Sequence, residues 1–492
     1  MTVNSQQSNK DGEDREPLSA SSASVQNDAI ETDNSSNLYV LFISAVAAIG
    51  GFLFGFDSGV INGTVTALEN TFNAGNVGTG FNVASVLLGC AFGALAAGPL
   101  ADKWGRKPIM AITAVVFAIS ALGSGIANSS LEFVMYRLLG GLGVGAASVL
   151  APAYIAEIAP AHLRGRLASL QQMAIVIGLF AAFLSNFSIA SYFGSAEAPA
   201  WFSIAAWRWM FWAELLPATL FLLGIMLIPE SPRFLIAKGQ TQAAQSIFQR
   251  ISPGSAETQV NQVSRSLQGG VQPKLAHLFI EGSKRIHPVV WVGVTLSVFQ
   301  QFVGINVVFY YGAQLWQAAG FDESQSLMIN VIGGITNVLS TVIAISLIDK
   351  IGRKPLLLCG SIGMAVTLSA LTYLFSTAGL DESGQLLLTD QSGLAALIAA
   401  NLYIVFFGMS WGPVVWVLLG EMFNNRLRGS ALALAASVQW LANFLVTMTF
   451  PILLAGIGLG GAYSLYASAA LISIFFVLKY IKETKGRTLE EM

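Results

Sequence analysis

The sequence has few charged residues for its length. Asp, Glu, Lys and Arg make up 11% of the 492 residues, whereas 54% are hydrophobic and the mean hydropathy is +0.64. Soluble globular proteins contain about 25% charged residues, so this composition indicates a protein embedded in a lipid bilayer. The net charge of −2 includes no basic excess, which argues against a nucleic acid partner.

Cysteine and histidine are also scarce. Cys90 and Cys359 lie in separate apolar runs, which excludes a disulfide framework and a paired-cysteine metal site. His162, His277 and His287 are scattered at the edges of apolar runs or in loops. No reactive cluster is visible, so the sequence predicts no metal, no cofactor and no enzyme activity.

The first 37 residues contain almost no large apolar side chains and are rich in Ser, Asn, Asp and Glu. Such a segment cannot bury enough surface to offset its ordering entropy, so we expect a disordered tail over residues 1–37. The tail has no basic start followed by a short apolar core, and it therefore does not resemble a cleaved signal peptide.

Long apolar runs dominate the rest of the chain. A bilayer core about 30 Å thick needs about 20 apolar residues per helix. Twelve ranges meet this requirement: 38–61, 80–101, 108–127, 131–156, 167–190, 209–229, 287–315, 325–348, 355–376, 392–419, 430–455 and 461–481. Six precede a polar stretch at 236–286 and six follow it, which predicts an all-α membrane protein with twelve transmembrane helices.

Lys and Arg are distributed unevenly among the connections between these spans. Of the 25, ten lie in even-numbered connections and thirteen in the N-tail, the segment 230–286 and the C-tail. The odd-numbered connections contain only Arg208, and Arg137 lies inside a span. By the positive-inside rule we expect a multi-pass protein of the cell membrane (inner or plasma membrane) with both termini in the cytoplasm.

Three motifs recur in the two halves of the chain. They pair GPLADKWGRKP with SLIDKIGRKP, AEIAPAHLRGR with GEMFNNRLRGS, and PESPRFL with KETKGRTLE. Matched motifs at matched places indicate two parallel six-helix repeats, an arrangement found in transporters that rock two bundles about a central site. We therefore expect bundles at 38–235 and 287–481, a cytoplasmic helical linker at 236–286 and a cytoplasmic tail at 482–492.

These motifs, together with QQFVGINVVFYY, SWGPVVW and QWLANF, resemble the sugar porter family of the major facilitator superfamily. The resemblance covers everything except the N-tail. It is strongest to bacterial and cyanobacterial proton-coupled glucose and xylose symporters. It implies the major facilitator fold, a sugar as substrate and a proton as coupling ion.

Uncharged amides inside the spans suit a sugar, because they donate and accept hydrogen bonds without carrying charge. The alternative is that such amides only join helices. The resemblance implies sugar contact for Gln172, Gln300, Gln301, Asn306, Asn337, Trp416, Gln439 and Asn443. Tyr310 and Tyr311 correspond to an outer gate, although aromatic packing is an equal use. Gly408 and Leu179 stand where family members have polar contacts, so the substrate cannot be copied from a relative; we expect glucose or a similar hexose.

Acids and arginines gather where spans are expected to end in the cytoplasm. The alternative is that these residues only set the membrane topology, but topology signals need basic residues and not carboxylates. We therefore expect an inner latch, whose acid–arginine pairs form and separate as the bundles move. Its members are Asp102, Arg106, Glu157, Arg164, Glu230, Arg233, Asp349, Arg353, Glu421 and Arg428. By contrast, the glycines of YRLLGGLGVGAAS (136–148) have small-xxx-small spacing, which predicts close helix packing.

Asp57 lies within the first apolar span and Arg137 within the fourth, at similar expected depths. Because an unpaired charge in a membrane is costly, each is the other's expected partner. Asp57 then serves as a proton site that releases Arg137 when protonated; a static ion pair or contact with outer water are the alternatives. Glu214 is a second intramembrane acid that acts either in a proton relay or in helix packing.

These features favour a monomeric proton-coupled symporter that imports a hexose, most of all D-glucose. A proton-independent facilitator with the same fold is the first alternative. A porter for xylose, fructose, inositol or another polyol is the second. A sugar receptor that no longer transports would share the motifs, but we would expect it to continue into a long signalling extension after KETKGRTLEEM.

Overall fold

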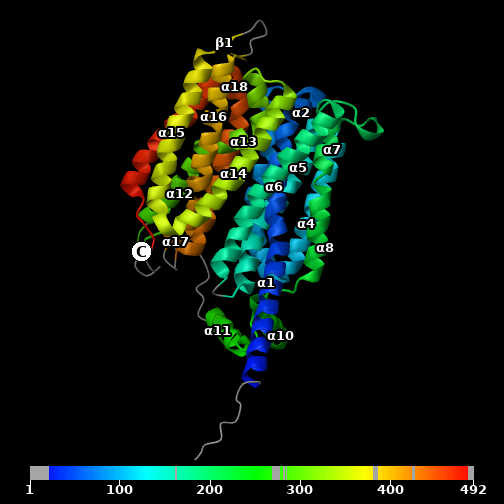
Figure 1. The fold of residues 1–492 in the computed structure, drawn as a ribbon, viewed down its shortest axis with the longest axis vertical. Coiled ribbons are helices and arrows are strands. Elements are labelled where there is room, and N and C mark those ends of the chain that lie inside the picture. The colour runs from blue at the N-terminus through cyan, green and yellow to red at the C-terminus, as the bar shows by residue number, and fades with distance from the viewer. Residues whose placement is uncertain are drawn as a thin grey trace, which may run out of the picture.

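The computed structural model describes residues 21–160, 163–268, 278–280, 283, 285–380, 386–423 and 427–485. Helices dominate this part of the chain, and one short antiparallel hairpin accompanies them (Figure 1). In chain order the elements are α1 (Ser21–Val60), η1 (Ile61–Gly63), α2 (Val65–Phe72), α3 (Asn76–Trp104), α4 (Arg106–Ile126), α5 (Ser130–Ile158), α6 (Arg164–Phe193), η2 (Trp201–Ser203), α7 (Ala206–Trp212), α8 (Leu215–Leu227), α9 (Pro232–Ala237), α10 (Thr241–Ile251), α11 (Ala256–Gln268), α12 (Pro288–Phe302), α13 (Ile305–Ala318), α14 (Glu323–Ile351), α15 (Arg353–Thr377), β1 (Gly379–Leu380), β2 (Leu386–Leu387), α16 (Asp390–Phe406), η4 (Phe407–Trp411), α17 (Gly412–Glu421) and α18 (Arg428–Tyr480).

Eleven continuous helical stretches in the described residues are long and apolar enough to cross a membrane. One of them, α18, has 53 residues and contains a non-helical backbone position at Gly458, where φ is 71°. Two helices therefore meet there without a polar loop, and they correspond to the predicted spans at 430–455 and 461–481. Counted this way, the structure agrees with the predicted twelve transmembrane helices.

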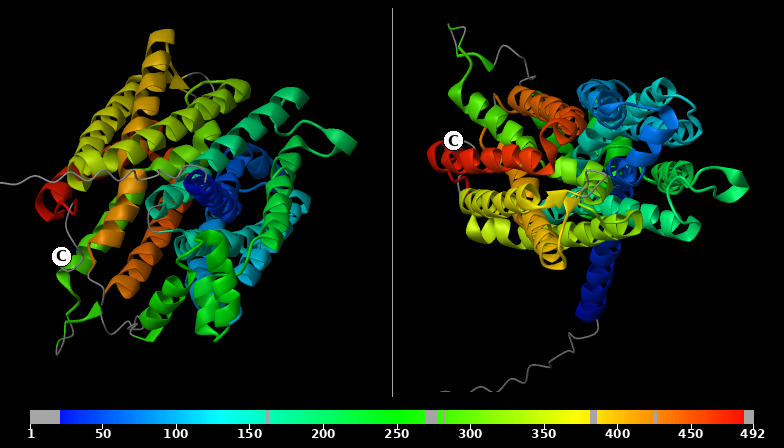
Figure 2. Two further views of the ribbon diagram at one scale, coloured as in Figure 1. Left: turned by 60° about the horizontal axis from the view of Figure 1, so that its bottom comes forward. Right: turned by 90° about the horizontal axis from the view of Figure 1, so that it is seen from above.

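The helices form two groups that lie side by side (Figure 2). The first bundle contains α1 to α8, in which α3 packs on α5 and α1 on α6. The second bundle contains α12 to α18, in which α15 packs on α18. Across the junction α3 contacts α18 and α6 contacts α14, so the centre of the molecule lies between these four helices.

Glycines bring α3 and α5 into backbone contact. A Cβ atom added at Gly141 would overlap the carbonyl oxygen of Val86, and one added at Gly89 would overlap that of Leu138. Helices in lipid gain no hydrophobic energy from meeting one another, so close van der Waals packing has to hold them together. The predicted packing role of the 136–148 glycines is confirmed.

The first helix begins earlier than its apolar run. α1 starts at Ser21, so it includes much of the segment 1–37 that the sequence predicts to be disordered; residues 1–20 lie outside the described residues. Once an apolar span has formed a helix, each added residue avoids the cost of nucleation, which allows a polar extension. In Figure 1 this extension projects beyond the bundles beside α10.

The segment between the bundles forms short helices, as expected for the 236–286 linker. Phe248, Ala256 and Val260 build a small core of their own between α10 and α11. The predicted break at 252–257 coincides with the turn between these two helices. The second predicted break, at 267–273, falls mostly outside the described residues.

Three spans are interrupted near their middle. α7 and α8 meet at Ala213 and Glu214, and α12 and α13 meet at Gly304, whose φ is 84°. The third interruption is the π-helical segment η4 between α16 and α17. Interrupted helices free backbone polar groups, which is tolerated at membrane depth only where protein or a cavity surrounds them.

Candidate functional site

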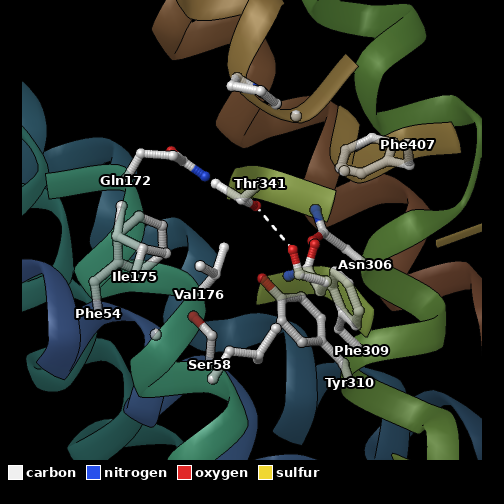
Figure 3. Close-up of a pocket in the computed structure, with 16 residues that line it drawn as sticks. Phe54, Ser58, Gln172, Ile175, Val176, Asn306, Phe309, Tyr310, Thr341 and Phe407 are labelled. Carbon is white, nitrogen blue, oxygen red and sulfur yellow. Dashed lines mark hydrogen bonds between the residues drawn. The ribbon is translucent and has the colours of Figure 1, made fainter. Parts of the chain in front are cut away.

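A cavity of about 130 Å³ lies between the two bundles (Figure 3). The first bundle contributes α1 and α6, and the second contributes α13, α14, η4 and α17. Its polar lining comprises Ser58, Gln172, Asn306, Tyr310, Asn337 and Thr341, and its aromatic lining comprises Phe54, Phe309 and Phe407. Pockets for drug-sized ligands measure about 300–1,000 Å³, so this cavity suits a small molecule.

One chain of amides runs from the cavity into the interrupted tenth span. Asn306 donates to Gln301 Oε1, and Gln301 Nε2 donates to Gln300 Oε1 at 3.4 Å. Gln300 Nε2 then donates to the carbonyl oxygens of Trp411 (2.8 Å) and Gly412 (3.2 Å). Gln300 therefore bonds to carbonyl groups where η4 meets α17, and Gln301 connects it to Asn306, which lines the cavity.

A second chain starts at Tyr310, whose hydroxyl faces the cavity beside Ser58. Asn443 Nδ2 donates to this hydroxyl at 3.4 Å, and Thr447 donates to Asn443 Oδ1 at 3.1 Å. Tyr311, the next residue, points elsewhere: its hydroxyl donates to the Thr447 carbonyl oxygen, and its ring packs against Phe450. Only one of the two gate tyrosines reaches the cavity.

The predicted sugar contacts thus fall into three sets. Gln172, Asn306 and Asn337 line the cavity. Gln300, Gln301 and Asn443 are buried behind it, and the buried Gln439 has an Oε1 atom without a hydrogen-bond partner among the described residues. Trp416 does not line the cavity: its side chain is 42% exposed, one helical turn beyond Gly412.

Sequence reasoning missed several lining residues. Phe54, Phe309 and Phe407 supply the aromatic faces expected from Trp416. Ser58 and Thr341 add hydroxyls, and the Thr341 hydroxyl donates to the Asn337 carbonyl oxygen at 2.9 Å. Their helical spacing was a usable signal: Ser58 follows Asp57 directly, and Thr341 lies one turn after Asn337.

Asp57 and Arg137 form a buried ion pair. Arg137 Nη1 donates to Asp57 Oδ1 at 2.6 Å, and each side chain is 1% exposed. The second carboxylate oxygen of Asp57 has no hydrogen-bond partner among the described residues. The expected partnership between α1 and α5 is therefore present, with one short side-chain contact and a longer bond from Arg137 Nη2 to the Asp57 carbonyl oxygen at 3.4 Å.

Glu214 lies at the α7–α8 interruption, close enough to interact electrostatically with both Asp57 and Arg137. Its side chain is buried, and neither carboxylate oxygen has a partner among the described residues. One arginine cannot neutralise two carboxylates, and an uncompensated buried charge is costly. This pocket thus contains one more acid than base, and a proton would balance it.

Two matching charge clusters mark one end of the molecule, here called the basic face. In the first bundle Arg106 contacts Asp102 (2.9 Å) and Glu157 (3.0 Å). In the second bundle Arg353 contacts Asp349 (3.1 Å) and Glu421 (2.7 Å). Each cluster ties helix ends within one bundle, which shows the sequence repeat as a repeat of contacts.

The remaining latch candidates differ in their surroundings. Glu230 accepts hydrogen bonds from the backbone N–H groups of Arg106, Lys107 and Ser231. Arg233 and Arg428 form no ion pair with any described residue. Arg164 begins α6, but its side chain lies outside the described part.

The glycines of the two GRKP motifs make room for an acid. Gly105 and Gly352 have φ values of 105° and 103°, a region that favours glycine. A Cβ atom would meet the carboxylate of Glu230 at Gly105, and that of Glu483 at Gly352. In both halves the carboxylate thereby reaches the start of the next helix, whose N–H groups favour a negative charge.

Replacing Glu483 with Gln should lower thermal stability at pH 7. Burial alone would raise the pKa of Glu483, but hydrogen bonds from the backbone N–H groups of Arg353, Lys485, Lys354 and Thr484 bring this pKa below its usual value. A lowered pKa stabilises the fold above the carboxyl's ordinary value, and this contribution disappears as the pH falls through the folded-state pKa. We expect a loss of about 1 kcal/mol at pH 7.

Thermal melts of wild type and Glu483→Gln between pH 3 and pH 7 would measure this effect. The two proteins should differ at pH 7 and converge in acid, whereas Glu257→Gln, at an exposed position in α11, should match wild type throughout. A difference that does not depend on pH would contradict the assignment.

Comparison with known proteins adds independent information. Residues 43–492 match the family model "Sugar (and other) transporter". The chain is 53% identical over 457 residues to the glucose transport protein of Synechocystis sp., covering 92% of this chain and 97% of that protein. It is 40% identical over 487 residues to the D-xylose-proton symporter of Escherichia coli, covering 92% and 95%. The partially occluded inward open structure of the E. coli xylose transporter XylE superposes with a TM-score of 0.78 at 37% identity, covering 92% of this chain and 99% of that one.

Proposed function

The chain belongs to the sugar (and other) transporter family, and from this we propose that it imports a hexose, D-glucose above all, together with a proton. It is a multi-pass membrane protein with the major facilitator fold. The observation that carries the proposal is the small amide-lined cavity at the junction of the two bundles. The cavity is reached from either membrane face in turn as the bundles rock about it.

A hexose needs paired donors and acceptors for its hydroxyls and an apolar face for its C–H groups. Gln172, Asn306 and Asn337 supply the first, and Phe54 and Phe309 supply the second. Gln300 and Gln301 hold Asn306 in place from behind. Leu179 and Gly408 also line the cavity but offer the sugar no polar group. This part of the lining favours a compact neutral sugar.

Proton coupling is proposed for Asp57, Arg137 and Glu214. Asp57 sits on the same turn of α1 as Ser58, which lines the cavity, so a change in the ion pair occurs next to the sugar. When Asp57 takes up a proton it releases Arg137, and Glu214 is then the acid left to balance the arginine. The similarity to a D-xylose-proton symporter supports this assignment.

We assign the basic face to the cytoplasm, because the Lys and Arg residues concentrate there. Both termini and α9 to α11 then lie in the cytoplasm. We propose that the protein works as a monomer in the inner or plasma membrane. The clusters around Arg106 and Arg353 keep each bundle rigid. Glu157, Glu421, Arg164 and Arg428 are proposed as members of the inner latch.

Uptake by purified protein in proteoliposomes tests the function. With an inward proton gradient, labelled glucose should accumulate above its external concentration, and a protonophore should abolish the accumulation. One proton moving through about 100 mV supplies about 2.3 kcal/mol, enough for roughly 40-fold accumulation of a neutral sugar. Equilibration without accumulation would instead support the proton-independent facilitator. A competition panel of glucose, fructose, xylose and inositol identifies the substrate.

Replacing Asn306 with Ala should raise the half-saturating glucose concentration about tenfold, equivalent to about 1.4 kcal/mol. The variant loses a cavity-facing amide and leaves Gln301 without its donor. Asn401→Ala is the matched control, because Asn401 accepts from Thr336 within the second bundle, away from the cavity lining. Glucose counterflow measures both variants, and an unchanged half-saturation in Asn306→Ala would remove Asn306 from the sugar site.

A further inference from the structure

A buried asparagine joins the two bundles at the end opposite the basic face, here called the opposite face. Asn62 follows α1 in η1 and is 1% exposed. Its Nδ2 donates to the Phe309 carbonyl oxygen at 2.9 Å and to Asn330 Oδ1 at 3.3 Å, and its Oδ1 accepts from the Ala313 N–H at 3.2 Å. All three bonds cross from the first bundle to α13 and α14 of the second.

Gly312 allows this contact. A Cβ atom at this position would overlap Asn330 Oδ1 and would come within 2.7 Å of Asn62 Nδ2. Gly312 lies inside α13 with ordinary helical backbone, so alanine would fit the helix and disturb only the contact. The closeness of η1 and α13 at this point therefore depends on the absence of a side chain at Gly312.

Three further hydrogen bonds surround this contact at the same face. Gln314 donates to Glu69 at 3.4 Å, Thr66 donates to Gln317 at 3.3 Å, and the Ala196 N–H donates to Glu323 at 2.8 Å. Each also joins the two bundles, whereas the ion pairs of the basic face in the described residues stay within one bundle. Among the described residues, hydrogen bonds thus hold the bundles together at the opposite face.

We propose that Asn62, Gly312 and Asn330 form a lock that closes the opposite end of the cavity, with Asn62 as the positioning residue through which α1 holds α13. The lock joins two elements that also line the cavity, since α1 contributes Ser58 and α13 contributes Asn306 and Tyr310. Opening the cavity toward the opposite face requires these three bonds to break. Its role in a transport cycle rests on the proposed function.

The lock can be tested by measuring how fast a reporter cysteine is labelled from each side of the membrane. This assay needs neither sugar nor a proton gradient. Leu179→Cys lines the cavity, and Cys90→Ala with Cys359→Ser removes the native thiols. A membrane-impermeant maleimide is applied to inside-out and right-side-out vesicles. Asn62→Ala and Gly312→Ala should each raise the labelling rate from the opposite face about tenfold and lower it from the basic face.

Faster labelling from the opposite face together with slower labelling from the basic face would indicate that the cavity now opens toward the opposite face. A general loosening of the protein would instead raise both labelling rates. Asn401→Ala removes an amide bond within one bundle, and Gly98→Ala adds a methyl group where no atom lies within 4 Å, so both should label like the parent. Unchanged labelling in Asn62→Ala and Gly312→Ala, or equal increases from both sides, would overturn the lock. Neither result depends on whether glucose is transported.

Discussion

Asp57→Asn should abolish gradient-driven accumulation of sugar while preserving sugar exchange. The amide keeps the size of the side chain but cannot bind and release a proton, and Arg137 loses the charge that now contacts it at 2.6 Å. Wild type should reach about 40-fold accumulation with one proton per sugar across about 100 mV. The variant should reach onefold, because it still equilibrates sugar.

Two assays on the same proteoliposomes separate coupling from transport. Gradient-driven uptake should be lost in Asp57→Asn, and counterflow, which needs no proton gradient, should persist. Glu257→Gln makes the same acid-to-amide change at an exposed site in α11 and should behave as wild type. Accumulation by Asp57→Asn at the wild-type level would exclude Asp57 as the proton site and leave Glu214 to be tested.

Gly141→Val should lower the stability of the protein more than Glu483→Gln does. The new side chain would occupy the space of the Val86 carbonyl oxygen and would also approach the backbone of Gly89 and Cys90. Backbone atoms cannot rotate away as a side-chain end can, so α3 and α5 must separate. We expect a loss of about 3 kcal/mol, at the upper end of ordinary overpacking.

Fluorescence-detected melting in detergent would measure this loss as a lower melting temperature and a smaller folded yield. Gly98→Val is the matched control in α3, because a Cβ atom there meets nothing within 4 Å. Equal melting temperatures for Gly141→Val and Gly98→Val would show that the close α3–α5 contact does not limit stability.

Much of the architecture could be predicted because a bilayer leaves few alternatives. Backbone groups in lipid must be satisfied within the chain, so each long apolar run becomes a helix. The repeated motifs then indicated two equivalent halves, and the contacts of Arg106 and Arg353 repeat almost bond for bond. The helix at Ser21 was not predicted, because composition does not show that an adjoining span can extend into a polar segment.

The site was harder to predict than the fold. The sequence showed which spans contain amides, but the rotation of each helix and the position of each interruption decide which amides face inward. Gln300 points to the carbonyl groups of Trp411 and Gly412 where η4 meets α17, whereas Asn306, after the break at Gly304, lines the cavity. Asn62 and Asn330 were overlooked because, as single polar residues near span ends, they resembled ordinary loop-side positions.

By itself, the sequence determined that the chain crosses a bilayer, that its halves repeat, and that Asp57 needs a basic partner, because each follows from the cost of exposing polar or charged groups to lipid. Only the tertiary structure decided that three of the eight predicted sugar contacts line the cavity, that Trp416 does not, and that Asn62 joins the bundles. These outcomes depend on helix rotation, on interrupted helices and on distances between distant segments, none of which a pattern along one chain contains.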